Sequence, residues 1–176
     1  MSAWKPSNIK SKERVKELGE VFTPPTLVGE MLNKLPTGSW EHAKTFLEPS
    51  CGTGNFLVQI VQRKIGAGST PLQALATTFG IDIMADNVNE CRGRLIQTAD
   101  ELEPLDAYQK VVANWIVCSN IVCGNALEGT MENKFASSNT QRGLRRTLIH
   151  DPLYFQNRGH FIVGEWLAQF AELPLL

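Results

Sequence analysis

The sequence predicts an α/β protein built on an open, doubly wound and mainly parallel sheet. Short apolar runs alternate along the chain with longer segments whose apolar residues recur at helical spacing. The first two runs each end in an acidic residue, and a glycine-rich turn follows the first. Strands that alternate with helices form parallel βαβ units, because a parallel connection has to cross the sheet.

Composition and charge limit the class of protein. The 176 residues suit one globular domain, and 17 Lys and Arg against 18 Asp and Glu argue weakly against tight stand-alone binding to a polyanion. No apolar run approaches the roughly 20 residues that span a bilayer, and residues 1–16 lack the apolar stretch of a signal peptide. We therefore expect a cytoplasmic protein without a membrane partner. The four cysteines form no CxxC pair, which disfavours a zinc site and a disulfide framework.

Residues 1–18 are expected to form a basic N-terminal arm, and residues 19–176 a single domain. The arm is either a short helix or a mobile, solvated leader. Its basic residues are Lys5, Lys10, Lys12, Arg14 and Lys16.

The first helix of the domain is predicted after Pro24 and Pro25, which suit its first turn. Thr23 is expected to cap it, and residues 36–38 end it. The apolar positions on one face of this helix are Leu27, Val28, Met31, Leu32 and Leu35.

Two predicted strands follow, with helices between them. Residues 45–48 form the first strand, and a helix with apolar positions from Phe56 to Ile65 follows the glycine turn. Glycines at 66 and 68 end that helix, and Thr70-Pro71 opens a short one. Residues 78–83 form the second buried strand.

The rest of the chain is predicted more coarsely. A third amphipathic helix covers residues 88–102, a further short element covers 111–117, and a third strand covers 120–127. Residues 129–143 are polar and turn-rich, which predicts a loop. An apolar pattern resumes over residues 160–170.

The glycine turn and the strand-end acids indicate a ligand. Gly52 and Gly54 let the chain turn tightly and let a ligand approach the backbone, but the third glycine of the dinucleotide motif is missing. A carboxylate at Glu48 repels a pyrophosphate and attracts an ammonium group. Asp82 ends the second strand, where acids accept hydrogen bonds from ribose hydroxyls. An adenosine ligand with a cationic tail and no phosphate is indicated, and S-adenosylmethionine fits this description.

At these residues the chain resembles a family. Residues 47–57, Leu-Glu-Pro-Ser-Cys-Gly-Thr-Gly-Asn-Phe-Leu, resemble the S-adenosylmethionine motif of amino-group DNA methyltransferases, in particular the gamma-type N6-adenine enzymes. Residues 19–25 match the family's N-terminal motif, which closes over the methionine part of the cofactor. Residues 80–83 match its ribose-binding motif. Residues 123–127 resemble its third motif, which faces the adenine, with Asn125 in place of the usual Asp.

The resemblance implies a Rossmann-like class I methyltransferase fold, S-adenosylmethionine as cofactor and no metal. Carried over residue by residue, it implies the following cofactor-binding residues: Phe22, Thr23, Pro24, Glu48, Pro49, Cys51, Gly52, Gly54, Asn55, Phe56, Asp82, Ile83, Asn125 and Ala126.

The family's catalytic tetrapeptide is Asn, Asp or Ser, followed by two prolines and Tyr or Phe. The candidate here has Asp151, Pro152 and Tyr154, with leucine for the second proline. By resemblance, Asp151 and the Pro152 carbonyl accept the hydrogens of the adenine amine, and Tyr154 stacks on the flipped-out base. Arginines and a histidine crowd the preceding segment, so an ordinary loop is the open alternative.

The resemblance implies transfer of a methyl group to adenine N6 in DNA, in a bacterial or phage-infected cell. Only residues 155–176 follow the candidate tetrapeptide, so we expect a short or truncated member with a reduced C-terminal half. A companion specificity or catalytic subunit, or a second copy, is a further expected partner. Two alternatives stay open: an inactive cofactor-binding module that acts as a subunit or anti-restriction factor, and a methyltransferase for RNA or protein.

Overall fold

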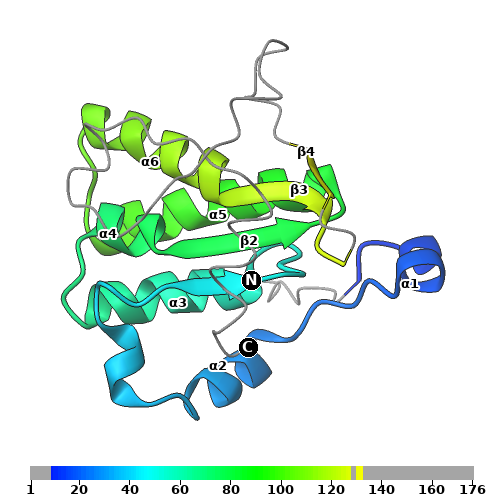
Figure 1. Ribbon diagram of the computed structural model, residues 1–176. Helices are drawn as coiled ribbons and strands as arrows, with labels where there is room; N and C mark the ends of the chain where they lie inside the picture. The colour runs from blue at the N-terminus through cyan, green and yellow to red at the C-terminus, as the bar shows by residue number, and fades with distance from the viewer. Residues whose placement is uncertain (1–8, 128–129, 133–176) are drawn as a thin grey trace, which may run out of the picture.

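A computed structural model describes residues 9–127 and 130–132 of the chain. This part of the protein is a mixed α/β structure in which helices pack against a small sheet (Figure 1). The strands β1 (Phe46–Glu48), β2 (Thr78–Asp82) and β3 (Ile121–Asn125) lie side by side in that order and are all parallel. The predicted alternation of parallel strands with helices is confirmed for the described residues.

A short fourth strand departs from the prediction. β4 (Thr130–Glu132) pairs with β3 in the antiparallel direction, with Thr130 opposite Asn125, so the loop predicted over residues 129–143 is wrong at its beginning. The chain turns at residues 126–127 and runs back along the outer edge of β3. This pairing satisfies backbone groups of β3 that an open sheet edge leaves exposed.

Two helices connect each pair of neighbouring parallel strands. Between β1 and β2 these are α3 (Asn55–Gly66) and α4 (Pro71–Ala76), and between β2 and β3 they are α5 (Ala85–Leu102) and α6 (Ala107–Asn120). Before the sheet, the chain forms α1 (Lys12–Leu18), α2 (Pro25–Leu32) and the 3₁₀ turn η1 (Thr37–Trp40). The N-terminal segment therefore contains a helix, one of the two forms left open by the sequence.

Local capping explains where two helices begin. α6 is longer than the predicted element at 111–117, because Asp106 accepts a hydrogen bond from the Gln109 N–H at 2.8 Å and the Gln109 side chain accepts one from the Asp106 N–H.

The prediction that Thr23 caps α2 is wrong. Pro24 is the N-cap of α2, and the Thr23 carbonyl instead accepts a hydrogen bond from Asn55.

The helices bury one face of the sheet. Apolar residues from α2 to α6 form a single buried cluster that includes Phe46 of β1 and Ile121 of β3. Gly80 of β2 faces this layer, because a Cβ there would lie 2.7 Å from Leu57 Cδ1 of α3. The absence of a side chain at this position lets α3 approach the strand closely.

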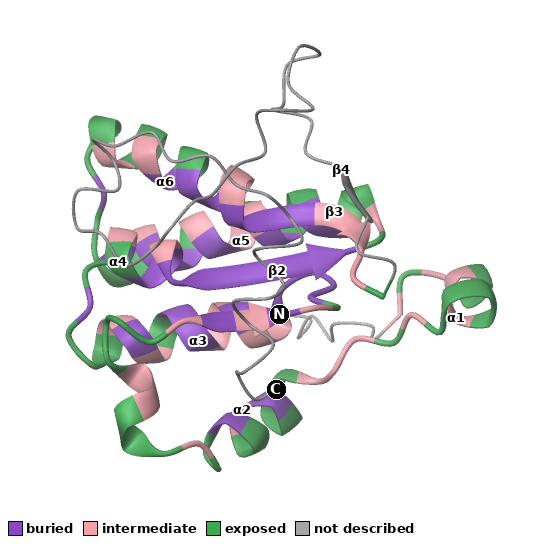
Figure 2. Ribbon diagram, viewed as in Figure 1, coloured by how far each residue is buried: buried purple, intermediate pink, exposed green. Residues whose placement is uncertain are grey.

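The other face of the sheet is apolar as well. Strand side chains alternate between the two faces, so Phe79, Ile81 and Val122 point away from the helical layer. β2 is buried along its whole length (Figure 2). Phe79, Ile81 and Val122 are all buried, and none of them belongs to the apolar cluster beneath the helices. Apolar residues on both faces are typical of parallel strands, which are covered on both sides.

A buried lysine anchors the segment before β1. Lys64 of α3 is fully buried, and its Nζ donates to the carbonyls of Glu41 at 3.1 Å and Lys44 at 2.7 Å. The ammonium lies 5.6 Å from the centre of the Phe46 ring. Burial lowers the pKa of Lys64 to about 8. The lysine thus replaces water as the partner of two loop carbonyls.

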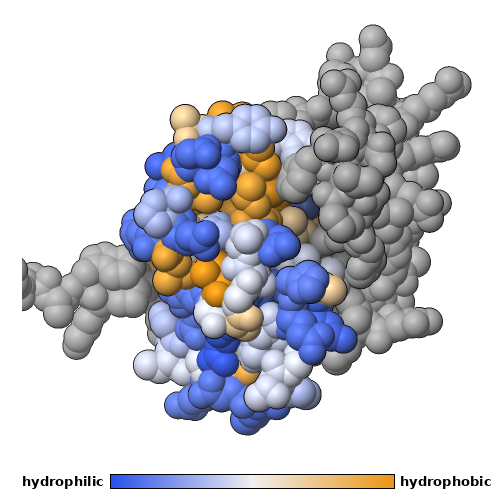
Figure 3. All heavy atoms as spheres, turned by 90° about the vertical axis from the view of Figure 1, so that its left-hand side faces the viewer, coloured by the Kyte–Doolittle hydropathy of each residue, from blue (hydrophilic) through white to orange (hydrophobic). Residues whose placement is uncertain are grey.

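The end of the molecule at the amino ends of the strands presents hydrophilic side chains with apolar areas between them (Figure 3). None of the described helices is both long and apolar enough to cross a membrane. The catalytic candidates Asp151, Pro152 and Tyr154 lie outside the described residues.

Candidate functional site

The carboxyl ends of the parallel strands bring the predicted polar residues to one edge of the sheet. Glu48 ends β1 and pairs with Gly80 in β2, while Asp82 ends β2 and pairs with Cys123 in β3. Asn125 ends β3 two residues further on. This edge, where ligands of open α/β sheets bind, is the candidate site.

The turn after β1 requires glycine at two positions. Gly52 has a φ of 51° and Gly54 a φ of 88°, both in the left-handed region. A Cβ on Gly52 would lie 2.9 Å from Cδ1 of Phe22, and one on Gly54 would lie 2.6 Å from Sγ of Cys91. Phe22 therefore lies directly on the glycine turn, so the segment before α2 covers the turn that follows β1.

Asp82 is buried and holds the glycine turn by a hydrogen bond. Its Oδ2 accepts from the Gly52 N–H at 2.9 Å, and its Oδ1 accepts from the Met84 N–H at 2.8 Å and from Asn87 Nδ2 at 3.1 Å. Each carboxylate oxygen can accept about two hydrogen bonds. Oδ1 is therefore saturated, whereas Oδ2 has capacity for one more donor.

Glu48 is a buried acid with a single hydrogen bond from the described residues, which its Oε1 accepts from the Ser50 N–H at 3.3 Å. Burial raises the pKa of Glu48 to about 7, although the Ser50 N–H acts in the opposite direction. A cationic ligand beside Glu48 would favour its ionised form. In its ionised form Glu48 is suited to act as the counter-ion of a cationic group.

A cavity of about 270 Å³ opens beside Glu48 and the glycine turn. It is lined by Val21, Phe22, Thr23, Glu48, Ser50, Cys51, Gly52, Asn55 and Phe56. Seven of these were predicted as cofactor-binding residues from the sequence. Val21 and Ser50 were missed, although each is a direct neighbour of predicted residues in a motif.

The other predicted residues lie outside the lining of this cavity: Pro24, Pro49, Gly54, Asp82, Ile83, Asn125 and Ala126. Ile83 is 54 % exposed although it is apolar and follows Asp82 directly. Asn125 Oδ1 accepts from the Leu127 N–H at 3.0 Å, which closes a local turn. Asp82 is connected to the cavity by its hydrogen bond from Gly52, which lines the cavity. Ile83 and Asn125 lie at the same edge of the sheet but do not line the cavity.

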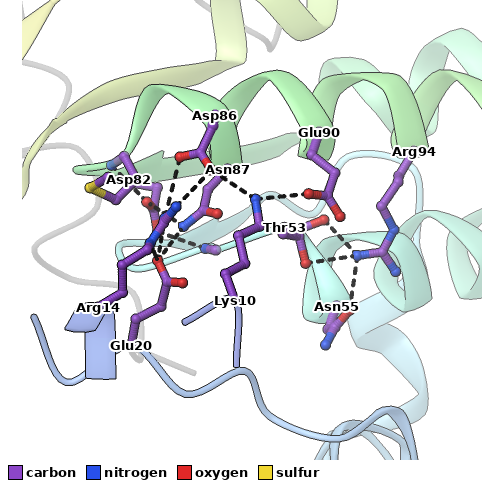
Figure 4. Close-up of polar contacts among 12 residues, drawn as sticks. Lys10, Arg14, Glu20, Thr53, Asn55, Asp82, Asp86, Asn87, Glu90 and Arg94 are labelled. Carbon is purple, nitrogen blue, oxygen red and sulfur yellow. Dashed lines mark hydrogen bonds and ion pairs between the residues drawn. The ribbon is translucent and has the colours of Figure 1, made fainter. Parts of the chain in front are cut away.

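A polar link holds the two walls of the cavity together. Asn55 Nδ2 donates to the Thr23 carbonyl at 2.9 Å, and Asn55 Oδ1 accepts from Arg94 of α5 at 2.9 Å (Figure 4). Arg94 also donates to the Thr53 carbonyl at 2.6 Å. Arg94 was missed by the sequence reasoning, since nothing in the pattern of α5 separates it from a solvated helix residue.

Two cysteines lie behind the glycine turn. Cys51 and Cys91 are both buried, and the neighbouring Cys91 thiol together with burial raises the pKa of the Cys51 thiol. A neutral thiol is a weak nucleophile and a weak metal ligand, so the role of Cys51 is to pack in the wall of the cavity. Within the described part of the chain, no group of three or more His, Cys, Asp or Glu side chains is arranged to hold a metal ion.

Comparison of the chain with known proteins yielded no match to a family model, a curated protein or a solved structure.

Proposed function

We propose that this protein is an S-adenosylmethionine-dependent methyltransferase that acts on adenine N6 in DNA. The observation that carries the cofactor assignment is the cavity in which Glu48, the Phe22 ring and the Gly52 turn meet, with Asp82 bonded to that turn. The DNA substrate rests on the resemblance of the four sequence motifs to those of the gamma-type enzymes.

The residues present fit this cofactor in charge and in shape. Glu48 would pair with the ammonium of the methionine part, and the bare backbone of Gly52 lets the Phe22 ring pack on the turn and form one wall of the cavity. The free capacity of Asp82 Oδ2 suits one ribose hydroxyl. Ile83 and Asn125, further along the strand edge, would contact the adenine. When bound, S-adenosylmethionine supplies a methyl group on a sulfonium, which is already an activated leaving group.

The size of the cavity supports placing the amino-acid part of the ligand inside it and the nucleoside outside it. Its volume of about 270 Å³ is near the lower end, roughly 300 Å³, of pockets that enclose a whole ligand. It suits the amino-acid part, with the nucleoside lying over Asp82 outside the enclosed space. A nucleotide would bring its phosphates to the buried Glu48, and this repulsion argues against a dinucleotide.

The strand order supports the proposed class I methyltransferase fold. β1, β2 and β3 correspond to one half of an open doubly wound sheet, and among the described strands β1 has a neighbour on one side only. In the doubly wound fold the second half continues from this edge, and the ligand lies where the strand order reverses. The proposed cofactor site lies at the carboxyl end of β1, the strand that stands next to this reversal in the doubly wound fold.

The roles of the chain in methyl transfer are binding, orientation and acceptance of protons. Residues at the strand edge hold the cofactor, and by resemblance Asp151 and the Pro152 carbonyl would orient the target amine while Tyr154 stacks on the base. The exocyclic amine would form the new nitrogen–carbon bond with its lone pair while the methyl–sulfur bond breaks and its electron pair passes to the sulfur. Asp151 would accept the proton that the amine loses.

Two measurements on the full chain test this proposal. Calorimetry should detect S-adenosylmethionine binding that is weakened at least tenfold, about 1.4 kcal/mol, by Asp82→Ala. Labelled cofactor should transfer its methyl group to unmethylated duplex DNA, and Asp151→Ala should abolish this transfer without loss of cofactor binding. Absence of cofactor binding would refute the proposal. Binding without transfer to DNA would favour the inactive subunit, and transfer to RNA or protein would reassign the substrate.

A further inference from the structure

Asn87 of α5 joins two carboxylates from distant parts of the chain. Its Nδ2 donates to Asp82 Oδ1 at 3.1 Å and to Glu20 Oε2 at 3.0 Å (Figure 4). An amide nitrogen carries two hydrogens, so both donors of Asn87 are used by the two acids. The reverse orientation of the amide would place its oxygen against both carboxylates, so only this orientation bonds them.

This junction is buried at a cost to stability. Asn87 is 1 % exposed and the Glu20 side chain 9 % exposed. Asn87 Oδ1 and Glu20 Oε1 are buried, and neither has a hydrogen-bond partner within the described part of the chain. A buried acceptor without a partner costs on the order of 1–3 kcal/mol. A polar junction of this kind is a poor way to stabilise a fold, which argues that it serves the site.

Glu20 is itself held from the other side. Its Oε2 accepts from Arg14 Nε of α1 at 2.9 Å, and Arg14 Nη1 lies 2.7 Å from Asp86 Oδ2 of α5. Lys10 pairs with the same Asp86 at 3.0 Å, and Arg14 together with Lys10 holds the pKa of Asp86 well below its ordinary value. The Glu20 carboxylate is thus fixed against α5 beside Asn87.

The hydrogen bond from Asn87 affects which oxygen of the Asp82 carboxylate is open to a ligand. With Asn87 and the Met84 N–H both on Oδ1, that oxygen has no capacity for another donor. Only Oδ2, which accepts from Gly52, has capacity left for a ligand. Without Asn87, Oδ1 would keep only the Met84 N–H and regain capacity for another donor, so the carboxylate could tilt between its two backbone donors and offer either oxygen to a ligand.

We propose that Asn87, held by Glu20, is a positioning residue that fixes the Asp82 carboxylate so that Oδ2 accepts a ribose hydroxyl. The inference rests on the proposed cofactor site and adds a determinant of specificity to it. Asn87 makes no contact with the ligand in this role. Its effect on affinity passes through one hydroxyl contact, so it depends on whether the ligand carries that hydroxyl.

The test compares ligands that differ only at the ribose. The probes are S-adenosylhomocysteine and its 2′-deoxy and 3′-deoxy analogues, titrated by calorimetry into the full chain. Asn87→Ala should weaken S-adenosylhomocysteine about tenfold or more, since a misoriented acid loses a charge-assisted hydrogen bond. The same variant should weaken one of the two deoxy analogues less than threefold, because the contact is already missing there.

Two further variants complete the design. Glu90→Ala is the matched control, because Glu90 lies on α5 one turn beyond Asn87 and pairs with Lys10 at 2.9 Å without contacting Asp82. It should bind every probe within twofold of the native chain. Asn87→Ser keeps one hydrogen-bond donor in the smaller side chain, and it takes the place of Asn87→Ala in the comparison if the alanine variant does not fold.

The outcomes separate the inference from the proposed function. An equal loss for all three probes, or no loss for any, would overturn the role of Asn87 while leaving the cofactor site intact. If the native chain binds none of the probes, the proposed function fails and the inference fails with it. A loss confined to S-adenosylhomocysteine and one deoxy analogue supports the inference and identifies the hydroxyl that Asp82 binds.

Discussion

The backbone N–H of Gly52 donates a hydrogen bond to Asp82 Oδ2 at 2.9 Å, and this bond joins residues 30 positions apart. It makes the glycine turn after β1 and the acid at the end of β2 one structural unit. Phe22 packs on the same glycine, so the predicted N-terminal motif and the glycine turn depend on each other.

Gly52→Ala should reduce cofactor affinity on the order of tenfold or more. The residue has a φ of 51°, which costs an alanine on the order of 1 kcal/mol, and its Cβ would lie 2.9 Å from Phe22 Cδ1. Phe22 would have to move off the turn and open the cavity wall. Calorimetry with S-adenosylmethionine measures the effect.

Gly66→Ala is the control for that substitution, because it adds the same methyl group in α3 with nothing within 4 Å of the new Cβ. It should leave affinity unchanged and raise stability by roughly 0.5–1 kcal/mol, since alanine is the better helix former. Equal affinities of the two variants would show that the Gly52 turn does not shape the site.

Cofactor affinity should rise with pH up to about pH 7. Burial raises the pKa of Glu48 to about 7, and only its ionised form attracts the ligand's ammonium. Below this pKa each pH unit costs close to a factor of ten, so the dissociation constant at pH 5.5 should be on the order of tenfold larger than at pH 7. Titrations across this range measure the slope. Glu48→Gln should remove the slope along with most of the affinity, and a slope that persists in this variant would assign the titration to another group.

Glu48→Gln should also stabilise the protein without ligand above pH 7. Because the folded pKa of Glu48, about 7, exceeds its ordinary value of 4.5, the folded state binds more protons than the unfolded state between these values. The stability of the native chain therefore falls as pH rises from 4.5 to 7, by an amount on the order of 3 kcal/mol. Urea unfolding should show a stability difference between variant and native chain that is larger at pH 8 than at pH 4.5, by up to this amount. A difference that does not change with pH would contradict the prediction.

Lys64 should give the opposite pH dependence at the alkaline end. Burial lowers its pKa to about 8 against an ordinary 10.5, so the unfolded state binds more protons between these values. The native chain should therefore gain stability relative to Lys64→Met as pH rises from 8 to 10.5, by up to about 3 kcal/mol. Urea unfolding of both proteins at pH 7.5 and pH 10 measures the gain. Parallel stability curves would mean that folding does not lower the pKa of Lys64.

Much of the fold was predictable because its signals are local. The apolar runs that became β1 and β2, and the helical spacing after Phe56, depend only on neighbouring residues. The errors arose where a partner from elsewhere decides the structure. Thr23 does not cap α2, because Pro24 takes the N-cap position and the Thr23 carbonyl accepts from Asn55, 32 residues away. Thr130 joins a strand because the edge of β3 lies beside it.

The sequence by itself determined that acids stand at the ends of β1 and β2 and that the turn after β1 requires glycine. A strand followed by a tight turn has to place Glu48 and Gly52 close together, whatever the rest of the chain does. The tertiary structure alone decided that Phe22 covers Gly52 and that Asn87 joins Asp82 to Glu20. These contacts span long stretches of chain, and their hydrogen-bond geometry exists only once the helices have packed on the sheet.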